Sequence, residues 1–558
     1  MDSKRDFSQE IKAYAFKNAL EFGKADAGRI LPKLFQHGLG KGQIKEIMPT
    51  IQRIVAEVNK FSVDEVRENF ENFKKYVKEH EEKEKGLPEL PGAVKGKVVV
   101  RVAPFPSGAL HIGNAKTFLL NALYAEKYDG KILLVMDDTI GSVEKPIEPE
   151  AYKLIREGFD WLGINYDKKI IYKSDRLEKY YKYGEELIKK DSAYVCHCEA
   201  DELRRNRALG KECGCRQFAK PIQILRWEEM FKAREGDATL RIKTDMEHPN
   251  PAFRDRVLFK ISDREHPRVG KKYRVWPTLE MSWAVDDVDL GITHIIRGND
   301  LMIETDMEKY IWDIFGWKHP HVFHTGMVNI EGIGAKISKS KSRAEVKSGE
   351  FTGWDDPRTW SLQSLKKRGI SPIALRDFAE EFGLNKQDIT VPIDALYSIN
   401  RRLIDLEADR YSFVMEPIKL NIRDLPKSIK VATIPIHPEK KGERIIHLND
   451  IFISREDFRK LKGKEIRLLH LFNIKLGDSE GSTSEFDSLA LKDIPKINWV
   501  SENVKADVLM PDGKHLIGIT EKSVKDLKVG QVIQFERFGF VCYQGVKDGE
   551  HEFWFAHK

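Results

Sequence analysis

Apolar residues recur at helical spacing through the N-terminal region. Phe7 and Ile11 fall four positions apart, as on one face of a helix. Ser62 followed by Glu65 has the form of a capping box, in which each side chain satisfies a backbone donor at a helix start. A charged stretch that becomes rich in Gly and Pro follows, and it predicts a linker. The pattern indicates a helical extension with its linker over 1–95.

The next hundred residues alternate between two periods. Short strand-like runs separate segments of helical periodicity, which predicts a parallel sheet with crossover helices. The strand-like runs are 97–103, 131–137 and 169–174, and the helix-like segments are 114–128, 148–162 and 175–190. Strand-like runs resume at 293–298 and 321–326, so an insertion splits the α/β domain into two halves.

The C-terminal part of the chain changes period again. After a helical stretch at 360–410, the runs become short and β-like with frequent turns, which predicts one or two antiparallel barrels. The fold class is therefore multidomain α/β. Its predicted parts are the extension (1–95), the first half of the α/β domain (96–195), an inserted domain (196–270), the second half (271–345), a helical connecting domain (346–410) and the β-barrels (411–558).

Composition narrows the class of protein. The 558 residues are 41% hydrophobic and 33% charged, which is typical of a soluble globular chain and argues against disorder. The sequence contains no long apolar run and no apolar leader, so we expect no membrane association, a cytoplasmic location and a monomer. The net charge of +6 permits a polyanionic partner without requiring one.

A cluster of special residues fills the turn between the first strand and its helix. The sequence RVAPFPSGALHIGN ends on His111, Gly113 and Asn114. A helix N-terminus offers unpaired N–H groups at the edge of the sheet where α/β folds bind ligands. Gly113 leaves room for a flat base, and His111 and Asn114 supply donors toward a polyphosphate. Four residues alone are weak evidence, and a Pro/Gly-rich loop with a surface His is the alternative.

A second motif, EGIGAKISKSKS, lies at 331–342. Lys336 and Lys339 flank Ser338 behind two glycines. A mobile loop with two ammonium groups can neutralise the charge that builds up when an α-phosphate is attacked and pyrophosphate departs. Taken alone, this run is better explained as a solvated basic loop.

Together the two motifs resemble the paired signatures of class I aminoacyl-tRNA synthetases, written HIGH and KMSKS, which bracket a Rossmann-type domain in this order. Asn114 replaces the last His of the first signature, and Ile337 replaces the Met of the second. The resemblance implies ATP with Mg²⁺. The implied ATP site is His111, Gly113, Asn114, Lys336, Ser338 and Lys339, of which His111, Asn114, Lys336 and Lys339 are also expected to be catalytic.

Three longer stretches of sequence narrow the resemblance to one branch of the class I aminoacyl-tRNA synthetases. VDDVDLGITHIIRGND, GWDDPRTWSLQSLKKRG and INRRLIDLEADRYSF are similar to archaeal-type glutamyl-tRNA synthetases and to the related glutaminyl enzymes. Those families end in β-barrels that grip the anticodon, and the resemblance covers nearly the whole chain. It implies a glutamate–tRNA ligase whose partners are L-glutamate, ATP and tRNA(Glu). The alternatives are a glutaminyl-tRNA synthetase, an enzyme that also charges tRNA(Gln) with glutamate, a small-molecule nucleotidyltransferase and a non-enzymatic RNA-binding descendant.

The resemblance also marks an amino-acid site. Arg101 and Arg297 match positions that hold the amino acid in this family, and Asp137 matches the acidic position that takes its α-ammonium group. Two Arg against one Asp leave a net positive charge, which suits a dicarboxylic substrate; surface salt bridges are the alternative. Five positions depart from the bacterial-type members: Phe105, Val135, Ile140, Leu279 and Trp283, in place of Ser, Arg, Asp, Tyr and Asn.

Four of the five cysteines form two CxC pairs within the predicted insertion, namely Cys196, Cys198, Cys213 and Cys215. Two close pairs can complete a tetrahedral thiolate site for one structural Zn²⁺, and four reduced thiols are the alternative. The resemblance implies a zinc-binding insertion that meets the acceptor end of the tRNA. The RRNRALGK run between the pairs suits either phosphate contact or a solvated helix face.

Overall fold

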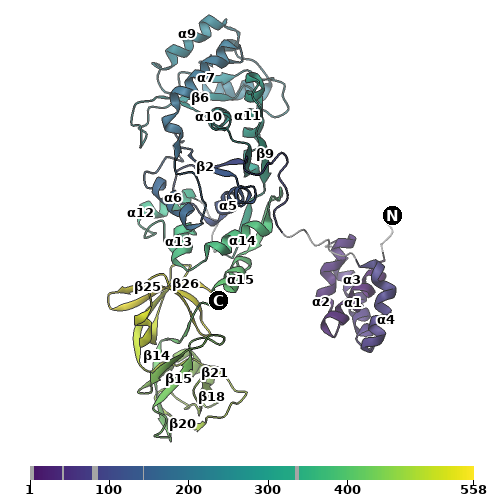
Figure 1. Ribbon diagram of the computed structural model, residues 1–558, viewed down its shortest axis with the longest axis vertical. Helices are drawn as coiled ribbons and strands as arrows, with labels where there is room; N and C mark the ends of the chain where they lie inside the picture. The colour runs from purple at the N-terminus through teal and green to yellow at the C-terminus, as the bar shows by residue number, and fades with distance from the viewer. Residues whose placement is uncertain (1–5, 41–42, 78–85, 143, 333–338) are drawn as a thin grey trace. The chain divides into compact units, whose positions relative to one another are not determined.

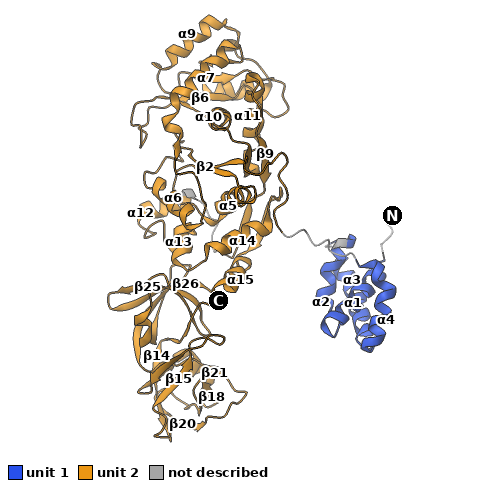
Figure 2. Ribbon diagram, viewed as in Figure 1, with its two compact units in different colours: residues 1–85 blue, residues 86–558 orange. Residues whose placement is uncertain are grey.

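The computed structural model describes residues 6–40, 43–77, 86–142, 144–332 and 339–558, with the backbone alone for residues 36, 339 and 340. The chain divides into two compact units, residues 1–85 and 86–558 (Figure 2). Nowhere in the described ranges does a helix combine the length and the hydropathy that a bilayer crossing requires.

The first unit is helical, as its periodicity predicts. Its α-helices are α1 (Ser8–Phe22), α2 (Ala27–Leu34), α3 (Ile44–Val58) and α4 (Val63–Phe73). They bury a common core that includes Ile11, Ile30 and Ile54. The capping box is confirmed, because the Ser62 hydroxyl accepts from the Glu65 N–H and the Glu65 carboxylate accepts from the Ser62 N–H at 2.8 Å.

The second unit contains the predicted parallel sheet in two halves (Figure 1). The first half is β1 (Val99–Val102), β2 (Lys131–Met136) and β3 (Ile171–Tyr172), and the second is β8 (His294–Gly298) and β9 (His321–Thr325), all paired in parallel. The halves meet where the Thr293 N–H donates to the Val99 carbonyl at 2.9 Å. The spatial order is therefore β3-β2-β1-β8-β9.

Helices cover both faces of this sheet, because successive strand side chains point to opposite sides. Val100 and Leu134 belong to one hydrophobic core, and Val99 and Leu133 pack against the other. The first face carries α5 (Ile112–Lys127), α6 (Ala151–Trp161), α13 (Leu362–Lys367), α14 (Pro372–Phe382) and α15 (Ile393–Ile404). The second carries α7 (Leu177–Lys189), α10 (Leu279–Asp289) and α11 (Met302–Phe315).

An antiparallel sheet stands between the two halves. Its strands, in order, are β4 (Ala193–Cys196), β5 (Thr239–Ile242), β6 (Val257–Ile261) and β7 (Val275–Pro277), with α8 (Ala200–Leu209) and α9 (Lys220–Met230) between β4 and β5. The sheet thus spans residues 193–277, close to the range expected for the insertion. The division of the whole chain into six parts remains a prediction.

One short strand departs from the helical prediction for 360–410. Residues Ile389–Pro392 form β11, which pairs in parallel with β10 (Val328–Glu331). Four residues are too few to show a period, and the pairing joins positions about sixty residues apart in sequence, so local pattern does not reveal it.

The C-terminal region forms two nearly closed β-sheets, which confirms the predicted barrels. One sheet has the order β12 (Arg410–Tyr411), β24 (Val532–Phe535), β25 (Gly539–Lys547), β26 (Glu550–His557), β22 (Asn503–Leu509), β23 (His515–Glu521) and β13 (Phe413–Met415). The other has the order β17 (Ile451–Ser454), β14 (Pro417–Arg423), β20 (Thr483–Ser488), β19 (Asn473–Lys475), β18 (Glu465–Leu468) and β21 (Lys496–Ile497).

Each of these sheets closes through its edges. In the first, the edge strands β12 and β13 are separated in sequence by Ser412 alone, so one continuous segment joins the two edges. In the second, Phe452 of β17 exchanges two backbone hydrogen bonds with Val500, just beyond β21. Most strand pairs are antiparallel, as expected, but β12–β24, β14–β20, β18–β21 and β22–β26 are parallel.

The turn between β1 and α5 is held by a segment more than 200 residues away. The Leu362 N–H donates to the Leu110 carbonyl at 2.8 Å, and the Ile112 N–H donates to the Trp360 carbonyl at 3.2 Å. Gly108 has a φ of 147°, and a Cβ at this position would lie 2.2 Å from the indole of Trp354. The Pro/Gly-rich turn therefore fits a specific tertiary neighbour.

Candidate active site

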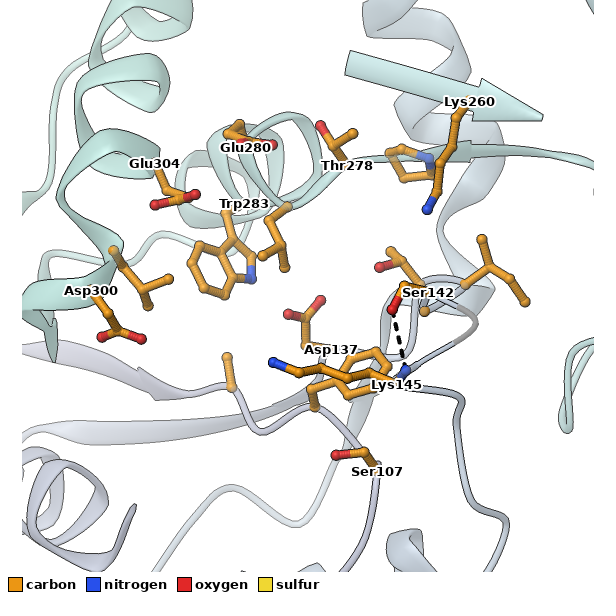
Figure 3. Close-up of a pocket in the computed structure, with 18 of the residues that line it drawn as sticks. Ser107, Asp137, Ser142, Lys145, Lys260, Thr278, Glu280, Trp283, Asp300 and Glu304 are labelled. Atoms are coloured by element: carbon orange, nitrogen blue, oxygen red, sulfur yellow. Dashed lines mark hydrogen bonds between the residues drawn. The ribbon is translucent and has the colours of Figure 1, made fainter. Parts of the chain in front are cut away.

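A cavity of about 950 Å³ opens at the carboxyl ends of β1, β2 and β8 (Figure 3). Its walls come from the turn after β1, the loop after β2, the starts of α10 and α11, and the inserted antiparallel sheet. This edge of a parallel sheet is where open α/β folds bind ligands.

His111 and Asn114 both border the cavity, as the motif predicts for a ligand site. His111 is the N-cap of α5, and its Nδ1 accepts from the Gly113 N–H at 3.1 Å. Among the described residues no group bonds the buried Oδ1 of Asn114. The start of α5 thus places the positive end of its backbone dipole beside the cavity.

The second motif reaches the same cavity through the helix that follows it. Lys336 and Ser338 lie outside the described residues, and Lys339 begins α12 (Lys339–Ser348) with its side chain outside the description. Arg343, one turn further along α12, borders the cavity and donates to the Glu144 carbonyl at 2.7 Å. Folding therefore places the end of this motif close to the α5 turn.

Asp137 ends the second strand and lies buried in the wall of the cavity. The ammonium group of Lys173 lies 2.9 Å from its Oδ1 and also donates to the Ser282 hydroxyl at 2.9 Å. Lys173 follows β3 and is fully buried, and sequence reasoning missed it. A lysine near the end of a predicted strand was the available signal.

Arg101 and Arg297 do not border the cavity; both are buried beside it and paired inside the protein. Arg101 binds both carboxylate oxygens of Asp287, and Arg297 donates to Glu308 at 2.9 and 2.6 Å. Burial disfavours the charge of Arg101, but the carboxylates of Asp287, Glu308 and Asp137 outweigh that effect and raise its pKa. The sequence analysis did not predict Asp287 or Glu308 as partners. The available signal was an acidic residue within an apolar helical run, which indicates a buried ion pair.

Four of the five departures noted in the sequence line the cavity: Phe105, Ile140, Leu279 and Trp283. Val135 is buried within β2 and is not among the lining residues. Trp283 separates the cavity from the basic residues behind it. The charged groups of Arg101, Lys173 and Arg297 lie 4.7, 4.8 and 5.3 Å from the centre of its indole, within cation–π range.

The remaining walls carry charges of both signs. Glu280 and Glu304 border the cavity, and both pair with Arg256, the residue before β6. Lys260, on β6, lines the cavity; burial lowers its pKa, and the charge of Arg264 lowers it further. The inserted sheet thus supplies basic residues to a cavity built mainly on the parallel sheet.

The four predicted cysteines meet at one point. All four Sγ atoms lie within 4.8 Å of one another, and the Cys196 and Cys213 sulfurs are 3.7 Å apart. Zn–S bonds of about 2.3 Å in a tetrahedron need sulfurs slightly under 4 Å apart, so the donor set fits zinc. The Cys196 thiol, then Tyr194 and Arg241, lower the pKa of Cys213 to about 4, which favours the thiolate that binds metal.

Arg241 lies directly behind this cluster. It is 1% exposed, and its Nη1 lies 3.7 Å from the Cys196 sulfur and 3.8 Å from the Cys213 sulfur. Its Nε donates to the Asp255 carbonyl at 2.8 Å, which fixes the guanidinium in place. A buried cation at hydrogen-bond distance from two thiolates would offset part of the charge of a four-thiolate zinc site.

Comparison with known proteins identifies the family. The catalytic domain of tRNA synthetases class I (E and Q) matches residues 97–405, and two anticodon-binding domains of the same family match residues 408–491 and 480–544. The chain is 41% identical to a glutamate–tRNA ligase of Pyrococcus furiosus, covering 98% of each chain. It is 40% identical to a glutamate–tRNA ligase of Methanocaldococcus jannaschii, covering 96% of this chain and 97% of the relative.

The resemblance seen in the sequence is thereby confirmed. The matched domains run from β1 into β25 and include both motifs, the residues that line the cavity, and both barrels apart from β26. The chain belongs to the class I tRNA synthetases of the E and Q family.

Proposed function

We propose that this protein is a glutamate–tRNA ligase that activates L-glutamate with ATP and joins it to the 3′ end of tRNA(Glu) during protein synthesis. The observation that carries the proposal is identity of 36–41% over nearly the full length of relatives that bear this name. A cavity at the ligand-binding edge of the parallel sheet supports it. The protein would work in the cytoplasm as a monomer.

The chemistry has two steps without a covalent enzyme intermediate. The α-carboxylate of glutamate attacks the α-phosphorus of ATP, so that an O–P bond forms and pyrophosphate leaves. A ribose hydroxyl of the terminal tRNA adenosine then attacks the activated carbonyl and releases AMP. The protein's part is to position the reactants and to stabilise developing charge. ATP enters with Mg²⁺, which supplies charge neutralisation on the phosphates.

We assign the residues according to their positions in the cavity. Asp137 would take the α-ammonium group of the amino acid from its place in the cavity wall. His111, Gly113 and Asn114 would meet the nucleotide at the start of α5. Lys336, Ser338 and Lys339 would complete the phosphate site, as the family motif implies.

The tRNA would extend from the cavity to the C-terminal barrels. The inserted segment, 196–270, would bind the acceptor end, and 411–558 would bind the anticodon, in line with the two anticodon-binding matches. Cys196, Cys198, Cys213 and Cys215 would hold one Zn²⁺ that stabilises the insertion without taking part in the reaction.

The proposal is tested by charging purified tRNA pools with labelled glutamate and, separately, with labelled glutamine. Incorporation of glutamate into tRNA(Glu) is expected. Incorporation of glutamine alone would make the protein a glutaminyl-tRNA synthetase, and no incorporation of either would overturn the proposal. Metal analysis of the purified protein before and after dialysis against a chelator tests whether the cysteine site holds a metal.

The lysine motif has its own test. Lys339→Ala is expected to retain tRNA affinity in a filter-binding assay while losing most adenylate formation, because the ammonium group acts only as phosphate charge develops. Lys347→Ala, a change near the end of the same helix, is the matched control. Unchanged turnover in Lys339→Ala would remove this lysine from the mechanism.

A further inference from the structure

The loop that follows β2 is bonded to three parts of the second unit that lie far from it in sequence. This β2 loop, residues 138–142 and 144–148, forms part of the cavity wall beside Asp137 (Figure 3). The first of its partners is the turn of the first motif, because the Glu148 N–H donates to the Pro106 carbonyl at 2.9 Å. The end of the β2 loop is therefore fixed to the turn that carries the first motif.

The second partner is the inserted sheet, through the connection between β6 and β7. Arg264 donates from its two terminal nitrogens to the carbonyls of Gly141 and Ser142, the latter at 2.9 Å. The buried imidazole of His266 lies with its Nε2 2.7 Å from the Asp138 carbonyl. All three acceptors are backbone carbonyls, so these bonds fix the course of the loop itself relative to the inserted sheet.

The third partner is α12, the helix that follows the lysine motif. Arg343 donates to the Glu144 carbonyl at 2.7 Å, and its Nε lies 3.9 Å from the Glu148 carboxylate. Lys347 also reaches Glu148, at 2.6 Å, but its side chain is 60% exposed, and exposed ion pairs contribute little. The Arg343 side chain is 16% exposed, so it is the stronger link between α12 and the loop.

The position of Arg343 determines what this link can do. It lies four residues after Lys339, the first residue of α12, which is about 6 Å along a helix axis. Because a helix is stiff over one turn, holding Arg343 also holds the start of α12 and the end of the lysine motif. A displacement of about 1 Å at a catalytic group can cost about 100-fold in rate. Residues that hold the loop can thus control the rate without touching a substrate.

We propose that Arg264 and Arg343 are positioning residues for the activation step. Each holds the β2 loop, and the loop sets α12 at the distance from the first motif at which the lysine motif meets the phosphates of ATP. The inserted sheet and α12 then share one support. This inference rests on the proposed function, because it takes adenylate formation as the step that the lysine motif serves.

The experiment measures glutamate-dependent exchange of pyrophosphate into ATP, with tRNA present, in wild type, Arg264→Met, Arg343→Met and the double variant. Each single change is expected to lower kcat about tenfold or more. The KM for ATP, the KM for glutamate and the tRNA affinity should stay near wild type, because the position of α12 matters only as phosphate charge develops. The double variant should lose far less than the product of the two single losses, because both changes release the same loop.

The chain offers a matched control for each arginine. Arg274, the residue before β7, donates to the carbonyls of Phe231 and Ala233 at 3.4 and 3.0 Å, both outside the β2 loop. Arg274→Met therefore removes the same kind of bond from the inserted sheet and should leave kcat unchanged. Lys347→Ala removes the exposed partner of Glu148 from α12 and should also leave kcat unchanged.

Three outcomes would overturn the inference. They are an unchanged kcat in either single variant, an equal loss in its control, and losses that multiply in the double variant, as expected if Arg343 contacts ATP directly. Where a Met variant does not fold, the Arg→Lys change at that position replaces it. Lysine keeps one donor but not the fork that reaches two acceptors, so part of the loss should remain.

Hydrogen–deuterium exchange provides a readout that needs no activity. The peptide that contains Glu148 should exchange faster in Arg264→Met and in Arg343→Met than in the wild type and the controls, because a loosened loop opens more often. Equal exchange in all of these proteins would also refute the inference. Failure of the wild type to use glutamate would count against the proposed function instead.

Discussion

At the scale of single residues, the turn between β1 and α5 both borders the cavity and packs closely against a distant segment. His111 and Asn114 line the cavity. Gly108 is not among the lining residues and instead packs against the Trp354 indole. The motif is therefore dense because two demands meet in one short turn. The sequence indicates the first demand, since a helix start after a strand is a ligand site, but the need for Gly108 depends on a neighbour 246 positions away in the chain.

We expect Gly108→Ala to destabilise the protein by about 2 kcal/mol or more. The new methyl group would overlap the indole, and overpacking of this kind typically costs 1–3 kcal/mol, to which the positive φ adds strain. Urea denaturation followed by circular dichroism measures the loss. Gly163→Ala is the control, because Gly163 also has a positive φ of 69° but an added Cβ there meets no atom within 4 Å. Equal effects in the two variants would show that the packing against Trp354 is unimportant.

At the scale of elements, the inserted sheet organises the cysteines around a buried cation. The strand β4 carries Cys196, β5 carries Arg241, and Cys213 lies in the loop between them. The spacing of the two CxC pairs predicts that their four thiols form one site. It gives no sign of Arg241, which becomes their neighbour only when β4 and β5 pair.

Arg241→Met should lower zinc affinity by about 10- to 100-fold, because outer-shell partners of metal ligands have effects of this size. Methionine keeps most of the buried volume and removes the charge. Competition with a chromophoric chelator measures the zinc affinity directly, and the measurement does not depend on the tRNA-charging activity of the variant. Arg254→Met is the control, because Arg254 bonds the carbonyls of His248 and Arg207. Equal affinity in wild type and Arg241→Met would exclude a role for this cation.

At the scale of the whole second unit, contacts join the α/β part to the seven-stranded barrel. The buried guanidinium of Arg368, just after α13, donates to the carbonyls of Phe555 and Ala556 at 3.1 and 2.8 Å. Asn400 of α15 donates to His557 Nε2 at 2.9 Å, so the imidazole is neutral, with its Nδ1–H directed to the Lys558 carbonyl. Burial is the main reason that the pKa of His557 falls to about 4.

This junction predicts a pH-dependent stability. Since the folded-state pKa of His557 lies below its unfolded value of about 6.5, the unfolded chain binds the proton more readily. Its stabilising contribution is complete above pH 6.5 and is lost as pH falls toward 4, by about 3 kcal/mol at most. Urea denaturation of wild type and His557→Gln at pH 7.5, 5.5 and 4.5 measures this. A difference between the two that does not change with pH would contradict the prediction.

The sequence by itself determined the elements, the parallel sheet, the barrels, the two motifs and the two CxC pairs. Each depends on a period or a spacing within a short stretch of chain, where local geometry decides which side chains share a face. Asp137, His111 and Asn114 reach the cavity because each follows a strand at its carboxyl end.

Tertiary structure alone decided which buried charged side chains pair with one another. Family resemblance predicts Arg101 and Arg297 as cations for a substrate, and folding pairs them with Asp287 and Glu308 and packs both guanidinium groups against Trp283 in the cavity wall. Pairing of buried charges depends on distance in space, because an unpaired charge in the interior costs far more than any local preference of the chain. The partners of these buried charges could not follow from motif spacing for that reason.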